Sequence, residues 1–101
     1  MACYRLIFQN DHAYEVEIDT AHIESAQGSV CSAVLYRVGA GGRESQPLLR
    51  TDRQPITIYA ISERATVNIA MEVLGTVSGS TLSRVTKCGG GFQPTRTPSP
   101  A

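Results

Sequence analysis

Ser62-Glu-Arg-Ala-Thr-Val-Asn-Ile-Ala-Met-Glu-Val-Leu-Gly-Thr-Val77 is the stretch that decides the fold. Ser62 occupies the position of an N-cap, and Glu63 would lie in the first turn, where the helix dipole favours a negative charge. Read at helical spacing, the stretch places one continuous apolar stripe on Val67, Ala70, Met71, Leu74 and Val77. The pattern predicts a helix over about residues 62–77.

The same stretch also has the alternation of a half-buried strand. From Val67 to Val73 every second residue is apolar, and several of these side chains are β-branched, which favours a strand. We favour the helix because its stripe is the longer of the two patterns and because a small sheet needs a second layer to cover it. An all-β domain is the alternative.

Short strands are predicted at residues 3–8, 14–19, 30–38, 56–61 and 81–87. In residues 14–19 apolar side chains alternate with carboxylates, so the first two strands are expected to form an antiparallel hairpin with one solvated face. In the third strand, a period of two makes Val30, Val34 and Tyr36 the inward positions.

These elements together predict an α+β fold, a small and mostly antiparallel sheet of four to five strands with one main helix packed on it. The strand, helix and strand at the end of the chain can run with their strands parallel through a right-handed crossover. Residues 1–88 are expected to form a single domain. Residues 89–101, rich in glycine, proline and threonine, are expected to be a disordered tail.

Composition bounds the class of protein. The chain has 101 residues, with nine basic and nine acidic side chains, and no apolar run of the ~18 residues that a membrane helix needs. Cys3, Cys31 and Cys88 are widely spaced and odd in number, which favours three reduced thiols in a reducing compartment. One disulfide and one free thiol is the alternative. We therefore expect a soluble protein of the cytoplasm, not associated with a membrane.

The histidines and cysteines do not form a recognisable metal motif. His12 and His22 are ten residues apart, whereas structural zinc usually needs at least one closely spaced ligand pair. No nucleophile motif is present either. We expect no metal, no cofactor and no catalytic residue, and the sequence argues against an enzyme more than for one.

Two groups of residues remain as candidate sites. The first is the region of Glu15, Glu17 and His22. If the protein is a small enzyme or a ligand-binding protein, the paired carboxylates of this region would do its acid–base work. Its more ordinary interpretation is a solvated strand face. The second is a possible binding patch of basic and aromatic side chains made of Arg37, Arg43, Arg50, Arg53 and Tyr59.

The leading hypothesis is a small non-catalytic domain that acts by self-association, as in a homodimer, or by binding a protein partner. Several short strands behind one helix would leave a sheet edge or face to be covered. A nucleic-acid-binding module that uses the region of Arg43, Arg50 and Arg53 is one alternative, although a net charge of zero argues against it.

Overall fold

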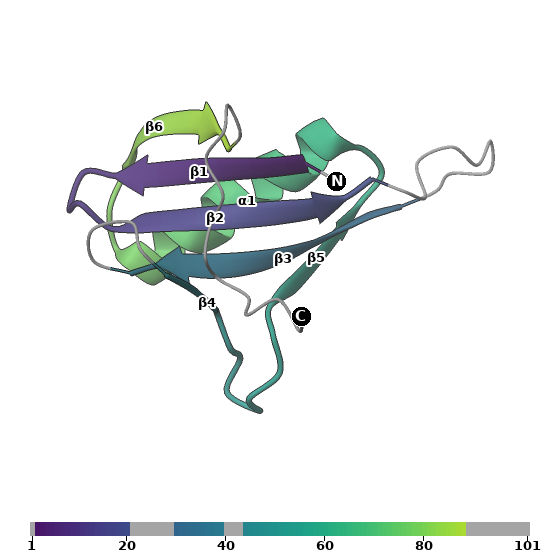
Figure 1. Ribbon diagram of the computed structural model, residues 1–101, viewed down its shortest axis with the longest axis horizontal. Helices are drawn as coiled ribbons and strands as arrows, with labels where there is room; N and C mark the ends of the chain where they lie inside the picture. Colours follow the sequence, from purple (N-terminus) through teal and green to yellow (C-terminus); the bar gives the residue numbers. More distant parts are fainter. Residues whose placement is uncertain (1, 21–29, 40–43, 89–101) are drawn as a thin grey trace.

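The computed structural model describes residues 2–20, 30–39 and 44–88, which form one six-stranded antiparallel sheet with a helix packed on one face (Figure 1). The elements in chain order are β1 (Ala2–Phe8), β2 (Ala13–Asp19), β3 (Cys31–Val38), β4 (Ser45–Pro47), β5 (Thr57–Ala60), α1 (Glu63–Ser78) and β6 (Leu82–Lys87). The predicted α+β class is therefore confirmed, with one short strand more than expected.

The sheet order is β4-β3-β2-β1-β6, and β5 pairs with the other half of β3. β4 and β5 thus lie end to end along one side of β3, with the segment between them extending away from the sheet (Figure 1). The predicted hairpin of the first two strands is present as the β1–β2 pair. β5 and β6 run in the same direction but at opposite sides of the sheet, so α1 crosses the whole sheet between them.

The helix begins and ends where local chemistry dictates. The Ser62 side chain accepts a hydrogen bond from the Ala65 N–H at 3.1 Å, which satisfies one of the free donors of the first turn. At the other end Gly79 adopts a left-handed conformation, with φ of 67°, and its N–H donates to the Gly75 carbonyl. The helix over residues 62–77 is confirmed, and the all-β alternative is wrong.

The core lies between α1 and one face of the sheet. Even-numbered residues of β1 and β2 share this face with odd-numbered residues of β3, because the strand register pairs Leu6 with Tyr14 and Val16 with Leu35. The fully buried apolar side chains include Leu6, Phe8, Val16, Ile18, Cys31, Leu35, Ala70 and Leu74.

The inward positions of the third strand were predicted one residue out of phase. Cys31, Ala33 and Leu35 face the helix, whereas Val30 is 42% exposed. Val34 and Tyr36 lie on the other face of the sheet, only partly buried. A one-residue shift moves every side chain of a strand to the opposite face, and the fully buried Leu35 shows which face of β3 belongs to the core.

The apolar stripe of the helix is also narrower than predicted. Ala70 and Leu74 are buried, and Val67 and Met71 pack against the core, but Val77 is 51% exposed. Val77 lies beyond Leu74, the last buried residue of the helix. Thr66 is instead fully buried, and its hydroxyl donates to the Ser62 carbonyl at 2.8 Å, which satisfies its polar group within the helix.

Within the part of the chain that the structure describes, no helix is both long enough and apolar enough to cross a bilayer. The predicted tail at residues 89–101, and most of the segment at 20–29, lie outside the described residues.

Candidate functional site

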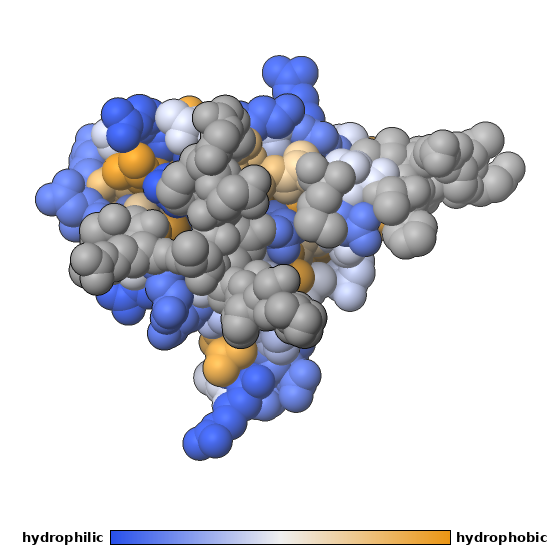
Figure 2. All heavy atoms as spheres, in the orientation of Figure 1, coloured by the Kyte–Doolittle hydropathy of each residue, from blue (hydrophilic) through white to orange (hydrophobic). Residues whose placement is uncertain are grey.

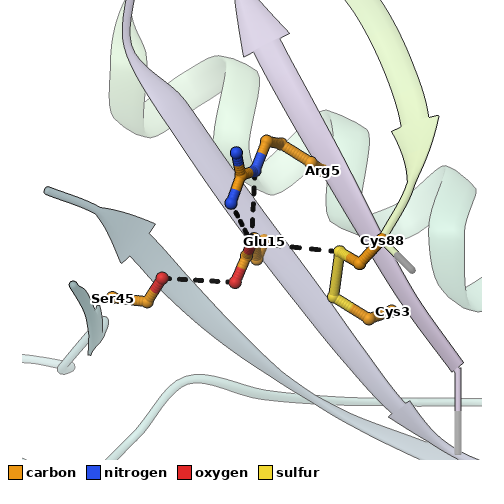
Figure 3. Close-up of polar contacts among 5 residues, drawn as sticks. All are labelled: Cys3, Arg5, Glu15, Ser45 and Cys88. Carbon is orange, nitrogen blue, oxygen red and sulfur yellow. Dashed lines mark hydrogen bonds and ion pairs between the residues drawn. A yellow bond between two sulfur atoms is a disulfide. The ribbon is translucent and has the colours of Figure 1, made fainter. Parts of the chain in front are cut away.

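The outer face of the sheet, which points away from α1, carries a compact group of polar side chains. Figure 3 shows its members converging from four strands, with Arg5 on β1, Glu15 on β2, Ser45 on β4, and Cys3 joined to Cys88 just after β6. We call Arg5, Glu15 and Ser45 together with the Cys3–Cys88 disulfide the polar cluster.

Strand register explains why these side chains meet. Antiparallel pairing puts Arg5 directly opposite Glu15, so the two side chains project from the same face of neighbouring strands. β1 also pairs with β6, and the Cys88 N–H donates to the Cys3 carbonyl at 2.9 Å, which continues that ladder by one residue pair. Ser45 arrives from the short strand beyond β3.

Glu15 is the centre of the polar cluster. Its side chain is fully buried, although the sequence predicted a solvated face there. Arg5 donates to Oε2 through Nη2 at 2.6 Å and through Nε at 3.2 Å, and the Ser45 hydroxyl donates to Oε1 at 3.2 Å. A carboxylate withdrawn from water needs such partners, since an unpaired buried charge costs several kcal/mol by order of magnitude.

A disulfide closes one side of the polar cluster. Cys3 and Cys88 are bonded, with Cα atoms 5.1 Å apart, while Cys31 is a free thiol in the core. The expectation of three reduced thiols is therefore wrong, and the alternative of one disulfide with one free thiol is right. Spacing along the chain gave no signal, because the two cysteines lie 85 residues apart and only the β1–β6 pairing brings them together.

The sulfur atoms lie close to the carboxylate. Cys88 Sγ is 3.9 Å from Glu15 Oε2, and one atom from each of Cys3, Glu15 and Cys88 falls within a span of 4.8 Å. In the bonded state neither sulfur is a thiolate, and the Arg5 guanidinium occupies the same carboxylate oxygen. The arrangement in this structure is therefore that of a disulfide beside an ion pair, not of a cation site.

The other residues of the predicted carboxylate region, and the two histidines, do not belong to the polar cluster. Glu17 is partly buried and accepts a long hydrogen bond, 3.5 Å, from the Tyr36 hydroxyl. Burial, and then the negative charge of Glu15, raise the pKa of Tyr36 above its usual value. That phenol therefore stays protonated and able to donate at neutral pH. His12 is exposed at the β1–β2 turn, and His22 lies outside the described residues.

The predicted basic patch is spread over several elements. Arg50 and Arg53 share a turn in the segment between β4 and β5, where Arg50 forms an exposed ion pair with Asp52 at 3.1 Å. Arg37 and Tyr59 belong to β3 and β5 and project from opposite faces of the sheet. Arg43 lies outside the described residues.

The segment between β4 and β5 extends well away from the sheet. Figure 2 shows hydrophilic side chains at its tip and a hydrophobic area directly above them. Leu49, which is 55% exposed, belongs to this segment and pairs with Pro55 through an isolated bridge. At its base the Leu48 N–H donates to the Leu35 carbonyl at 2.9 Å and the Leu35 N–H donates to the Ile56 carbonyl at 3.3 Å, so the segment continues the pairing with β3 before it extends away.

A cavity of about 240 Å³ adjoins the end of β3. Its lining residues are Arg37, Val38, Gly39, Glu44 and Gln46. Gly39 closes this corner by donating its N–H to the Glu44 carbonyl at 2.6 Å, and a Cβ at that position would lie 2.7 Å from the same oxygen. Gly39 must therefore be a glycine, because only a residue without a Cβ allows the backbone of Glu44 to come this close.

The two sides of the sheet are protected to different degrees. On the β3 side, β4 and β5 are short and are separated by the extended segment, and Pro47 lies in β4. Short strands and proline are devices that prevent edge-to-edge pairing. On the other side β6 is a continuous strand of six residues, five of them exposed, and among the described residues it pairs only with β1.

The ladder also fixes which backbone groups of β6 point outward. Because Cys88 donates to Cys3, the alternation of an antiparallel pair directs the N–H groups of Arg84 and Thr86 toward β1. Those of Val85 and Lys87 then point away from the sheet. We call this outward side of Leu82–Lys87 the β6 edge. The sequence predicted the strand, but nothing in it showed that this strand would lie at the edge of the sheet that the described residues form.

Comparison with known proteins finds no matching family model, no matching curated protein and no matching solved structure.

Proposed function

We propose that this chain is a non-catalytic binding domain that self-associates through the β6 edge, pairing with β6 of a second copy in antiparallel orientation. The observation that carries the proposal is the contrast between the two sides of the sheet. One side is interrupted and contains proline, whereas β6 is an exposed strand whose ladder with β1 is regular from Arg84 to Lys87.

The parity of the ladder supports one particular register. From Arg84 to Lys87, where the ladder with β1 is regular, outward N–H groups alternate, so a two-fold axis at Val85 pairs that residue with its own copy in a hydrogen-bonded position. Arg84 then lies opposite Thr86 of the second copy, and Lys87 lies opposite Ser83. No two like charges face each other directly, which removes the main electrostatic objection to pairing a basic strand with itself.

Side-chain burial favours the same axis. Val85 is 38% exposed and projects from the helix side of the sheet, since it pairs with Leu6 in the ladder. Pairing across the axis would cover both valines and join the two sheets into one, with the two helices on the same face. Among the described residues the basic side chains of β6 have no acidic neighbour on that strand, so an acidic extended segment of another protein is the competing occupant.

The test compares variants at Val85. Val85→Pro removes an N–H that points outward and leaves the bonds to β1 in place, because edge strands tolerate proline on their solvent side. Val85→Ala is the matched control, which shortens the same side chain and keeps the N–H. We expect a dimer at high micromolar concentration by light scattering for the parent and Val85→Ala, and a monomer with an unchanged circular dichroism spectrum for Val85→Pro.

A parent chain that stays monomeric at every concentration would refute self-association. If that monomer binds an acidic extended peptide and Val85→Pro abolishes the binding, the β6 edge serves a protein partner instead. If Val85→Pro dimerises as well as Val85→Ala does, the dimer uses another surface.

The compartment belongs to the same proposal. The sequence favoured the cytoplasm, where thiols are kept reduced, yet Cys3 and Cys88 are bonded. Disulfides of cytoplasmic proteins are usually transient and redox-sensing, whereas structural ones belong to oxidising compartments. We retain the cytoplasm as the proposed location, which requires that the disulfide form and break.

A further inference from the structure

We propose that the Cys3–Cys88 disulfide is a reversible thiol–disulfide exchange site that determines whether β6 stays bound to the sheet. The inference stands on the geometry of the disulfide, of β6 and of Glu15. This role of the disulfide does not depend on self-association, although opening of the disulfide would regulate self-association.

The disulfide joins two residues that are not fully buried. Cys3 and Cys88 are both only partly buried, unlike Cys31, which is fully buried in the core. Exchange requires that a thiolate reach one of the two sulfur atoms, so exposure separates a bond that can turn over from one that cannot. The third cysteine is in turn shielded from the mixed pairings that would scramble the site.

β6 depends on the disulfide more than any other strand does. Among the described elements it pairs only with β1, and five of its six residues are exposed, so little apolar burial holds it. Its ladder with β1 is also irregular between Ile7 and Phe8. Besides backbone hydrogen bonds, the covalent link at Cys88 is therefore the main constraint on the end of the strand. Strands held by few buried contacts are the first to open.

The polar cluster tunes the exchange step. In reduction, an external thiolate bonds to Cys3 Sγ, the sulfur–sulfur bond breaks, and Cys88 leaves with the electron pair and takes a proton from water. A second external thiol then releases Cys3 as a thiol, so two thiols become one external disulfide and the protein gains two thiols. The charge on the departing Cys88 sulfur develops 3.9 Å from the Glu15 carboxylate, which opposes it.

Arg5 weakens the repulsion between the Glu15 carboxylate and the departing sulfur, and Glu15 can also bind the Cys88 thiol of the reduced state. The guanidinium is 2.6 Å from the same carboxylate oxygen, so the local field is that of a neutralised pair and not of a bare charge. Once protonated, the Cys88 thiol can donate to Glu15 Oε2 as a weak hydrogen bond. Glu15 is thus a positioning residue that slows the opening of the disulfide and stabilises the open thiol.

The first experiment measures hydrogen exchange of the full chain before and after treatment with dithiothreitol without denaturant, at a concentration where the chain is monomeric. Alkylation and mass spectrometry locate the new thiols, which we expect at Cys3 and Cys88 and not at Cys31. The amides of Arg84 and Thr86 should then exchange at least tenfold faster, while amides of the central strands, such as Val16, change much less.

Three outcomes would overturn the inference. The first is a disulfide that resists dithiothreitol in the folded chain, which would make it purely structural. The second is unchanged exchange at Arg84 and Thr86 after reduction, which would mean that β6 does not depend on the disulfide. The third is unfolding of the entire chain on reduction, visible as fast exchange at Val16 as well. None of these bears on whether the oxidised chain dimerises, so failure here is distinct from failure of the proposed function.

The second experiment isolates the role of Glu15. Glu15→Gln removes the charge and keeps the size, and Ser45→Ala is the matched control that removes one hydrogen bond and keeps the charge. By the dependence of exchange rates on the leaving thiol, Glu15→Gln should be reduced about three- to tenfold faster and Ser45→Ala within about twofold of the parent. Equal acceleration in both variants would mean that loosened packing, not charge, sets the rate.

Discussion

Separating the two members of the Arg5–Glu15 ion pair should destabilise the fold unequally. Glu15 is fully buried, whereas the Arg5 side chain keeps 22% of its surface exposed. A guanidinium that loses its partner can therefore turn toward water, but a carboxylate that loses its partner cannot. The asymmetry follows from burial and not from the bonds, because both residues lose the same bonds when either one is replaced.

The structure sets the size of the effect. Arg5→Met removes the counter-ion of the fully buried Glu15, and should lower the free energy of unfolding by about 3–5 kcal/mol, as for a buried charge without its counter-ion. Glu15→Gln keeps the shape and leaves a partly exposed cation, at a cost of about 1–3 kcal/mol. The double variant leaves neither a buried carboxylate nor a guanidinium without its counter-ion. Its loss in the free energy of unfolding should therefore be smaller than the sum of the two single losses.

Urea unfolding of the oxidised chain, followed by circular dichroism at low micromolar concentration, measures all four proteins of this cycle. The slope of free energy against urea should be the same for each, since the surface exposed on unfolding hardly changes. The reasoning is refuted if Glu15→Gln costs more than Arg5→Met, or if the two losses add in the double variant. Additivity would mean that the two side chains do not interact in solution.

Two further predictions concern the helix and its contact with β1. Ser62→Ala removes the acceptor of the Ala65 N–H and should lower the free energy of unfolding, measured by urea unfolding, by about 1 kcal/mol. Ser62→Asp keeps an acceptor at the N-cap and should retain most of that stability. The Tyr4 hydroxyl donates to the Glu63 carboxylate, and this bond, then burial, then the charge of Glu63 raise the pKa of Tyr4 above 10.0. A raised pKa in the folded state means that the contribution of Tyr4 is complete at neutral pH and is lost as the pH rises past about 10, where the unfolded phenol ionises. The stability gap between the parent and Tyr4→Phe, from urea midpoints over a pH series, should therefore narrow in alkali, and a gap independent of pH would contradict the assignment.

Local sequence was enough for the elements that have local causes. The N-cap at Ser62, the left-handed stop at Gly79 and the alternation of Tyr14–Asp19 each act within a few residues, so the helix and the first hairpin are predictable without tertiary information. The third strand shows where this ends. Its apolar residues permit either phase, and the choice of Leu35 as an inward residue depends on the strand beside it and the helix above it.

The candidate site illustrates the same division. The sequence indicated the carboxylates of β2, but interpreted them as solvated, since alternation shows which side chains share a face and not what covers that face. Glu15 is buried, and it accepts hydrogen bonds from Arg5 on β1 and from Ser45 on β4. Those contacts arise from register and from strand order, neither of which is encoded within any one segment.

The helix at residues 62–77, the antiparallel hairpin and the α+β class were thus determined by the sequence itself, because period, caps and turns act over short range. The disulfide, the burial of Glu15 and the open side of β6 were decided only by the tertiary structure. Cys3 and Cys88 meet because the last described strand returns to pair with the first, and β6 is the open side because no described strand pairs with its outer edge. Long-range pairing creates both features, and it is a property of the whole sheet.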